Sequence, residues 1–167
     1  MDELNTPLLN QQVKNQLKRG KPISAILFEN TTGFEIPIKQ KLENLINWMI
    51  QTEKQPPDWE ISIIYINNET ISQLNKKHLN KNRATDVISF NLTDEFSENP
   101  EGEIYISLEQ AQQQAIDYSA SFEEEVIRLT AHGVFHLFGY EDETEEKRNH
   151  MSQLENSAIE YFQNHKF

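Results

Sequence analysis

Two histidines and an aspartate in the C-terminal third of the chain have the spacing of a metal site. His132 and His136 are four residues apart, so on a helix their imidazoles lie one above the other. Gly139 can end that helix and turn the chain, and Asp142 follows three residues later. Three protein ligands leave a tetrahedral ion one open position for water, which is the arrangement of catalytic zinc. The spacing is that of the extended zinc-peptidase motif, and it predicts a zinc site at His132, His136 and Asp142.

The third ligand has two competing interpretations. A carboxylate just after the glycine is placed to return to the histidines, but Asp142 and Glu145 also have the spacing of a capping box. Asp142 would then only begin the last helix, or would share its two oxygens between both roles. His150, about two turns into that helix, is an outside candidate, although its position is more typical of a surface residue.

The donor set favours zinc, and one residue separates this chain from the zinc peptidases. Two imidazoles and one carboxylate suit Zn²⁺, and they also suit non-haem iron or nickel. A zinc peptidase carries glutamate, its general base, directly after the first histidine, and here that residue is Gly133. We therefore expect a peptidase-like metal cradle with different chemistry. No catalytic residue is assigned beyond the water that the ion would bind.

The elements that must position this cradle follow from hydrophobic spacing and cap signals. Ser121 and Glu124 have capping-box spacing and should open the helix that carries both histidines, and Ser107 with Gln110 should open the helix before it. Helical periodicity and β-branched runs predict the others. The expected strands are 24–28, 60–66, 86–92 and 103–106, and the expected helices are 37–52, 69–79, 107–117, the histidine helix from 121, and 143–163.

This order predicts a single α+β domain over residues 22–167, with residues 1–21 as a polar N-terminal arm in which a short helix over 9–17 fits the pattern. We expect a mixed sheet of about four strands packed with helices. The closeness of the late strands predicts at least one antiparallel pair. The metal site would lie on a C-terminal helix and the turn after it, as in zincin-like proteins.

Composition limits the partners. The chain has 167 residues, no cysteine and a formal net charge of −12. Disulfide-linked partners and thiolate metal sites are excluded, and no apolar run is long enough for a bilayer. The negative charge counts against nonspecific nucleic-acid binding, so an RNA-acting function needs a local basic patch. The densest basic cluster is Lys76, Lys77, Lys81 and Arg83, which equally fits a solvated helix end.

Residues 132–142, HGVFHLFGYED, resemble the signature H-G-x-x-H-L-x-G-Y-D-H of the YbeY-type endoribonucleases, also called rRNA maturation factors. A second family segment reads roughly N-x-x-Y-R-x4-P-T-D-V-L-S-F. In this chain, Asn75 and then residues 85–90 match its spacing. A third, Gly-Asp-Ile followed by Ser, has the frame of residues 102–104 and Ser107. The resemblance spans about residues 60–155 in the family's order.

The resemblance implies a zinc-dependent endoribonuclease of the bacterial cytoplasm that cleaves single-stranded RNA. Its implied roles are 16S rRNA 3′-end maturation and ribosome quality control, with the 16S rRNA precursor and the small ribosomal subunit as partners. Two positions depart from the family. Its third histidine falls on Asp142, whose negative charge should make the ion a weaker Lewis acid. The family's arginine, which is thought to help hold RNA or its phosphate, falls on Leu79. That role cannot be carried over to Leu79, although Arg83, four residues on, is a candidate substitute.

These departures keep an alternative open. A ribosome-associated factor with a structural zinc and little nuclease activity is favoured by the missing arginine and by the net charge of −12. A zinc peptidase is disfavoured because Gly133 stands in place of the glutamate.

Overall fold

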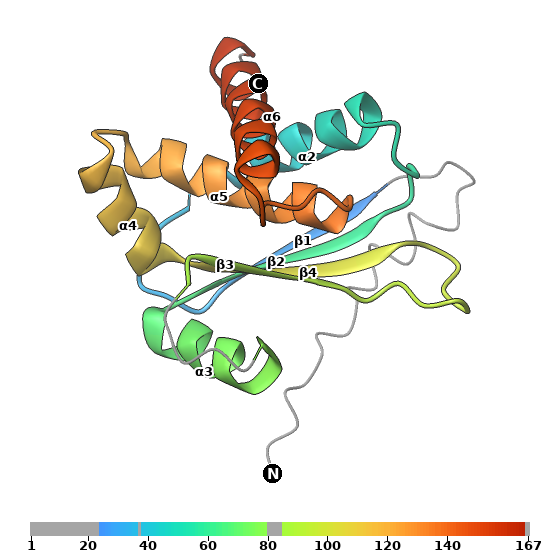
Figure 1. Cartoon of the computed structure of the whole chain (residues 1–167), viewed down its shortest axis with the longest axis horizontal. Coiled ribbons are helices and arrows are strands. Elements are labelled where there is room, and N and C mark those ends of the chain that lie inside the picture. Colours follow the sequence, from blue (N-terminus) through green and yellow to red (C-terminus); the bar gives the residue numbers. More distant parts are fainter. Residues whose placement is uncertain (1–23, 37, 80–84, 166–167) are drawn as a thin grey trace.

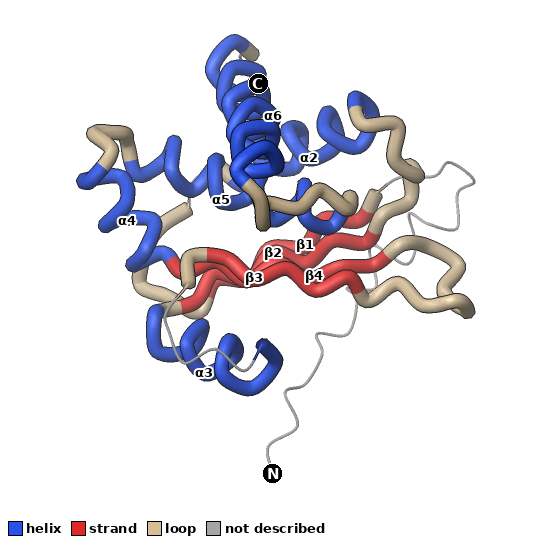
Figure 2. Tube along the Cα trace, in the orientation of Figure 1, coloured by secondary structure: helices blue, strands red, loops and turns tan. Residues whose placement is uncertain are grey.

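The computed structural model describes residues 24–36, 38–79 and 85–165. It contains one four-stranded sheet in the order β1-β2-β4-β3 (Figures 1 and 2). β2 pairs in parallel with β1 and with β4, and β3 pairs antiparallel with β4. The single α+β domain with a mixed sheet is therefore confirmed, including its antiparallel pair. The strands are β1 (Ala25–Asn30), β2 (Glu60–Ile66), β3 (Val87–Asn91) and β4 (Glu101–Ser107).

The helices cover the two faces of the sheet unequally. Figure 1 shows α2, α5 and α6 on one side of the sheet and α3 on the other, with α4 linking β4 to α5 at the end of the molecule. The side with three helices encloses the main core, which includes Ile63 and Tyr65 of β2. α3 covers a small second core around Ile71. The helices are α2 (Lys39–Thr52), α3 (Asn68–Leu79), α4 (Leu108–Asp117), α5 (Phe122–Leu137) and α6 (Glu145–Asn164).

Side chains of β2 alternate between these two cores, as a strand buried on both faces requires. Ile61, Ile63 and Tyr65 belong to the main core, whereas Ile66 belongs to the second core and Ile64 packs against it. The β-branched run that predicts this strand is thus explained by burial on both sides. No helix in the described ranges is both long and apolar enough to cross a membrane.

Local cap signals set the starts of the helices that lead to the metal site. Ser107 Oγ accepts the N–H of Gln110 at 3.3 Å, and Ser121 Oγ accepts the N–H of Glu124 at 3.0 Å, as predicted. β4 begins at Glu101 rather than Glu103, because Glu101 pairs with Glu60 of β2 and its carbonyl accepts the N–H of Leu92. The polar arm, Lys81 and Arg83 lie outside the described residues.

Candidate metal centre

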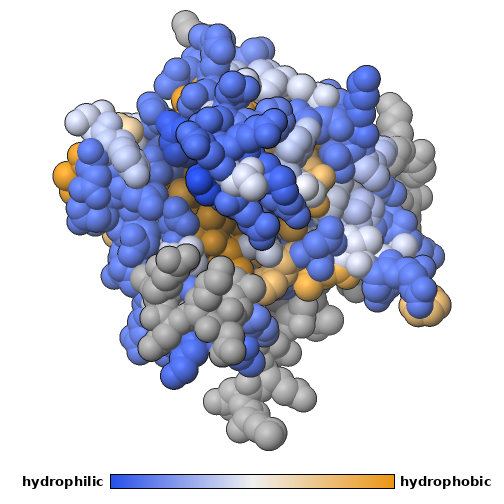
Figure 3. Space-filling model, viewed as in Figure 1, coloured by the Kyte–Doolittle hydropathy of each residue, from blue (hydrophilic) through white to orange (hydrophobic). Residues whose placement is uncertain are grey.

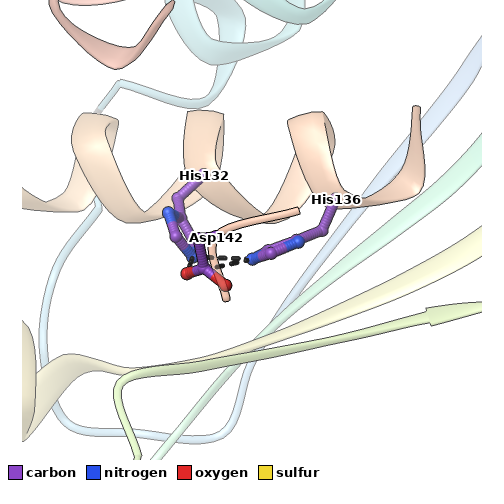
Figure 4. A group of neighbouring side chains, drawn as sticks. All are labelled: His132, His136 and Asp142. Carbon is purple, nitrogen blue, oxygen red and sulfur yellow. Dashed lines mark hydrogen bonds and ion pairs between the residues drawn. The ribbon is translucent and has the colours of Figure 1, made fainter. Parts of the chain in front are cut away.

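Three donor atoms converge at the C-terminal end of α5 (Figure 4). His132 Nε2 and His136 Nε2 are 2.9 Å apart, and Asp142 Oδ2 lies 3.6 Å from the first and 3.7 Å from the second. The edge of a tetrahedron with zinc-to-ligand bonds of ~2.0–2.1 Å is about 3.3 Å. The three residues therefore form a group that could hold one metal ion.

The turn after α5 brings Asp142 back to the histidines. The Gly139 N–H donates to the carbonyl of His136 at 3.0 Å, and the Tyr140 N–H donates to that of Phe135 at 3.1 Å, which together form a Schellman motif. Gly139 has a φ of +95°, where any residue with a Cβ is strained. The glycine therefore does what its position in the sequence predicts: it ends the helix and reverses the chain toward the donor atoms.

Asp142 is not the N-cap of α6. That position belongs to Thr144, whose Oγ1 accepts the N–H of Lys147 at 3.2 Å. The Asp142 side chain is 39% exposed and faces the two Nε2 atoms, while its backbone carbonyl accepts a hydrogen bond from Arg148. The carboxylate is thus available for coordination. His150, the outside candidate, is exposed, and its ring lies near Tyr140.

Hydrogen bonds at the outer nitrogens orient both imidazoles. His136 Nδ1 lies 2.8 Å from the carbonyl oxygen of Tyr140, and His132 Nδ1 lies 2.7 Å from Glu155 Oε1. A carbonyl and an ionised carboxylate only accept, so each Nδ1 carries the hydrogen and each Nε2 presents a lone pair. Two lone pairs at 2.9 Å repel unless a proton or a metal ion lies between them. The donor set therefore fits a divalent metal ion.

The two histidines differ in their electrostatic surroundings. Burial lowers the pKa of His132. The hydrogen bond to Glu155 and the charge of that carboxylate act in the opposite direction and outweigh burial, so the pKa of His132 is raised. Burial and the neighbouring His132 lower the pKa of His136. The lowered pKa of His136 favours its neutral imidazole, which is the form that binds metal.

Gly133 faces the sheet rather than the ion. A Cβ added there would lie 2.5 Å from Ile104 Cγ2 and 3.2 Å from Ser89 Oγ. The Gly133 carbonyl also accepts a hydrogen bond from Ser89 Oγ at 2.9 Å. The position at which a zinc peptidase places its general base has no room for a side chain here. Packing thus explains the glycine and argues against peptidase chemistry.

Glu155 and Arg128 join the metal centre although the donor spacing does not predict them. Glu155 is 8% exposed and occupies the buried face of α6 between Met151 and Ala158. A carboxylate within an apolar stripe must have a partner. The position of Glu155 in the sequence therefore indicates that it has a buried partner, but not which residue that partner is. The partners are His132 and Arg128, whose Nη1 lies 3.5 Å from Glu155 Oε2.

The two described residues of the basic cluster, Lys76 and Lys77, lie apart from the donor atoms. Lys76 and Lys77 are exposed on the last turn of α3, on the opposite side of the sheet from α5. Among the flanking acidic residues, Glu141 pairs with Lys147, which lowers the pKa of the Glu141 carboxyl. That pairing holds the Glu141 carboxylate in a surface ion pair.

Comparisons with known proteins place this arrangement in a family. The family model described as Endoribonuclease YbeY matches residues 27–163. A protein named "Endoribonuclease YbeY" from Desulforamulus reducens is 39% identical over 148 residues, which cover 81% of this chain and 95% of that relative. Another of the same name, from Chloroherpeton thalassium, is 37% identical over 136 residues, covering 81% and 93%.

The fold has a solved counterpart. The solution structure of TM1509 from Thermotoga maritima superposes with a TM-score of 0.59 at 23% sequence identity, covering 82% of this chain and 88% of that one. At this identity the likeness concerns the fold alone. The family match extends over nearly all of the described residues and includes all three donors of the metal centre. The chain therefore belongs to the Endoribonuclease YbeY family.

Proposed function

We propose that the protein is a zinc-dependent endoribonuclease that cleaves single-stranded RNA at the His132–His136–Asp142 centre. The observation that carries the proposal is the convergence of two Nε2 lone pairs and one carboxylate oxygen on a single point. Two relatives that match this chain over more than nine-tenths of their own length bear the name of an endoribonuclease. When bound, the ion supplies an acidified water and neutralises a phosphate oxygen.

The chain's own residues supply the positioning. The Schellman turn at Gly139 and the hydrogen bonds of Arg148 to the carbonyls of Asp142 and Glu143 fix the aspartate, while the Nδ1 hydrogen bonds fix the imidazoles. Rigid ligands keep the ion in one place while the RNA strand moves to it. Asp142 also adds negative charge, which we expect to hold the ion more strongly and to reduce its Lewis acidity relative to a third histidine.

We further propose that RNA approaches past the edge strand β3. Lys76 and Lys77 of α3 and the metal centre on α5 lie on opposite sides of the sheet, and β3 is the outermost strand between them. Figure 3 shows an apolar hollow between the α5–α6 turn and the sheet on this face. Phosphates would contact the basic cluster of Lys76, Lys77, Lys81 and Arg83, and an unpaired base would enter the apolar hollow.

The test is RNA cleavage by the purified full chain. We expect single-stranded RNA to be cleaved, cleavage to stop with a chelator and return with zinc, and His136→Ala to abolish it. His150→Ala is the matched control, since it removes an exposed histidine that is outside the donor group and should keep activity. Elemental analysis of the freshly isolated protein identifies the ion among zinc, nickel and iron. Cleavage that persists in His136→Ala and in chelator would contradict the proposal.

The proposed cellular role is 3′-end maturation of the 16S rRNA precursor and ribosome quality control in the bacterial cytoplasm, with the small ribosomal subunit as partner. Deletion of the gene should lead to 3′-extended 16S rRNA, and the wild-type chain but not His136→Ala should restore maturation. Normal 16S ends in the deletion strain would overturn this role.

A second function competes with the first, because the chain carries a net charge of −12 and has Leu79 at the family's arginine position. In this alternative the zinc braces the fold and the protein binds the small subunit without cleaving RNA. Stoichiometric zinc and subunit binding, with no cleavage of any single-stranded RNA tested, would favour it over the nuclease.

A further inference from the structure

We propose that Glu155 is a positioning residue of the metal centre. Its carboxylate, held by Arg128, fixes the tautomer and ring orientation of His132 and so sets the affinity of the site for its ion. This inference rests on the proposed function only in requiring that the three donors bind a divalent metal.

The contact between Glu155 and His132 has the geometry of a charge-assisted hydrogen bond. Oε1 lies 2.7 Å from Nδ1, between residues that are 23 positions apart on α6 and α5. The Glu155 side chain is 10% exposed and that of His132 is 19% exposed, so water competes little for either group. An acceptor at Nδ1 forces the hydrogen onto that nitrogen and leaves the Nε2 lone pair directed at the donor group.

Arg128 holds the carboxylate in place from the other side. Its Nη1 lies 3.5 Å from Glu155 Oε2, and its Nε lies 3.5 Å from Oε2 of Glu125. Interactions with Glu124 and Asn156 fix the guanidinium in turn. With Oε1 on the imidazole and Oε2 on the arginine, the Glu155 carboxylate has little freedom to rotate. Arg128 also balances part of the negative charge that burial would otherwise penalise.

The two imidazoles are supported differently. The Nδ1 hydrogen of His136 goes to the backbone carbonyl of Tyr140, a neutral group fixed by the helix-ending turn. The Nδ1 hydrogen of His132 goes to a side chain on another helix. Of the two imidazoles, only that of His132 is therefore oriented by a replaceable side chain. Removal of such a support weakens metal binding by about 10–100-fold in comparable sites.

A purely structural role makes a different prediction. Glu155 lies on the buried face of α6, so in that case its removal would loosen the packing of α6 on α5 without changing the site itself. Glu155→Gln separates the two roles, because the amide keeps the shape and an acceptor oxygen but loses the charge. Glu155→Ala loses both. Glu160→Ala removes an exposed glutamate from the same helix and is the matched control.

The experiment is competition for Zn²⁺ between the full chain and a chromophoric chelator, with circular dichroism to verify that each variant is folded. We expect Glu155→Ala to bind zinc about 10–100-fold more weakly than wild type, Glu155→Gln to be intermediate, and Glu160→Ala to be unchanged. Imidazole ¹⁵N chemical shifts of the metal-free protein provide a second readout. They should show the His132 hydrogen on Nδ1 in wild type and a mixture of tautomers in Glu155→Ala.

Each outcome separates this inference from the proposed function. If wild type binds zinc and folded Glu155→Gln and Glu155→Ala bind it within about twofold, with the tautomer unchanged, the positioning role is wrong and the metal centre stands. If wild type binds no zinc, the proposed function fails and this inference fails with it. Should Glu155→Ala not fold, the affinity and ¹⁵N spectrum of Glu155→Gln decide.

Discussion

Gly133 offers the sharpest test of how packing shapes the metal centre, because its replacement by alanine adds one methyl group at a defined position. The new Cβ would lie 2.5 Å from Ile104 Cγ2, well inside van der Waals contact. Ile104 is fully buried on the central strand β4, and Cγ2 is attached directly to its Cβ. This methyl can move away only by a rotation about χ1, which would also displace the Cγ1 branch into the packed core.

The magnitude follows from two opposing effects. Overpacking a core by one methylene costs about 1–3 kcal/mol, whereas glycine to alanine within a helix gains about 1 kcal/mol of helix propensity. The 2.5 Å approach involves a fully buried β-branched side chain, so we expect the cost of overpacking to fall in the upper part of its range. The net expectation is a decrease of about 1–2 kcal/mol in the free energy of unfolding.

Urea unfolding in the presence of a chelator measures this decrease without any contribution from bound metal. Gly33→Ala is the matched control, since a Cβ there meets nothing within 4 Å, and it should unfold within about 0.5 kcal/mol of wild type. In an Ile104→Ala background the Gly133→Ala change should become neutral or stabilising, because the offending methyl is gone and the new one fills part of the cavity. If Gly133→Ala unfolds at a urea midpoint equal to or above that of wild type, packing against Ile104 does not explain why a glycine stands where a zinc peptidase has its glutamate.

The remaining predictions concern the donors, a buried acid and the basic cluster. Asp142→Ala should weaken Zn²⁺ binding in competition with a chelator. In calorimetry, zinc at 100 times its Kd should stabilise wild type by about 2.7 kcal/mol, and Asp142→Ala should not gain this stability at the same zinc concentration. Burial raises the pKa of Glu125, so the folded chain binds its proton more readily than the unfolded one, and stability falls as pH rises from the ordinary carboxyl pKa through the raised one. Glu125→Gln should flatten this fall in urea midpoints measured between pH 4 and 8, and an unchanged slope would contradict the assignment. Replacing both Lys76 and Lys77 by glutamine should reduce the salt dependence of single-stranded RNA binding by about 0.7 for each phosphate that these lysines neutralise, and an unchanged slope would place the RNA elsewhere.

The parts of the site that sequence reasoning finds are those encoded by short-range patterns. The histidine spacing, the cap at Ser121 and the turning glycine each act within one or two helical turns, and the structure contains all three. Each pattern has a single physical solution: stacked donors on one helix face, a satisfied N–H at the helix start, and a backbone with positive φ. The placement of the two histidine donors is therefore local, and the sequence alone predicts it.

Where patterns overlap, sequence reasoning cannot choose. Asp142 with Glu145 and Thr144 with Lys147 both offer a side-chain acceptor three residues before a backbone N–H. The first pair has the capping-box composition, yet Thr144 is the cap. Asp142 follows a turn that directs its side chain at the histidines, so it cannot also close the first turn of α6. The decision depends on the direction of the chain after Gly139, which is a three-dimensional property.

Long-range partners escape the sequence for a related reason. β4 begins two residues early because Glu101 pairs with Glu60 of β2 and its carbonyl accepts the N–H of Leu92, the residue just after β3. Glu155 stands out in the buried stripe of α6, but nothing in the sequence says that the partner it requires is His132. A buried charge predicts that a partner exists, whereas only the packing of α6 on α5 identifies it.

The charge around the donor group connects the two functions that remain in competition. Asp142 brings a carboxylate to the ion directly, and Glu155 brings a second one through His132, with Arg128 as partial compensation. Carboxylate charge holds a divalent ion more strongly, and it also lowers the positive charge that the ion can offer to a phosphate. A zinc ion that is bound tightly but is a weak Lewis acid suits a structural role. A zinc ion that is bound less tightly but is a strong Lewis acid suits RNA hydrolysis. Asp142→His removes one of these charges while keeping three donors. Faster RNA cleavage together with weaker zinc binding in this variant would identify Asp142 as the residue that lowers the nuclease activity of this chain relative to a site with three histidines.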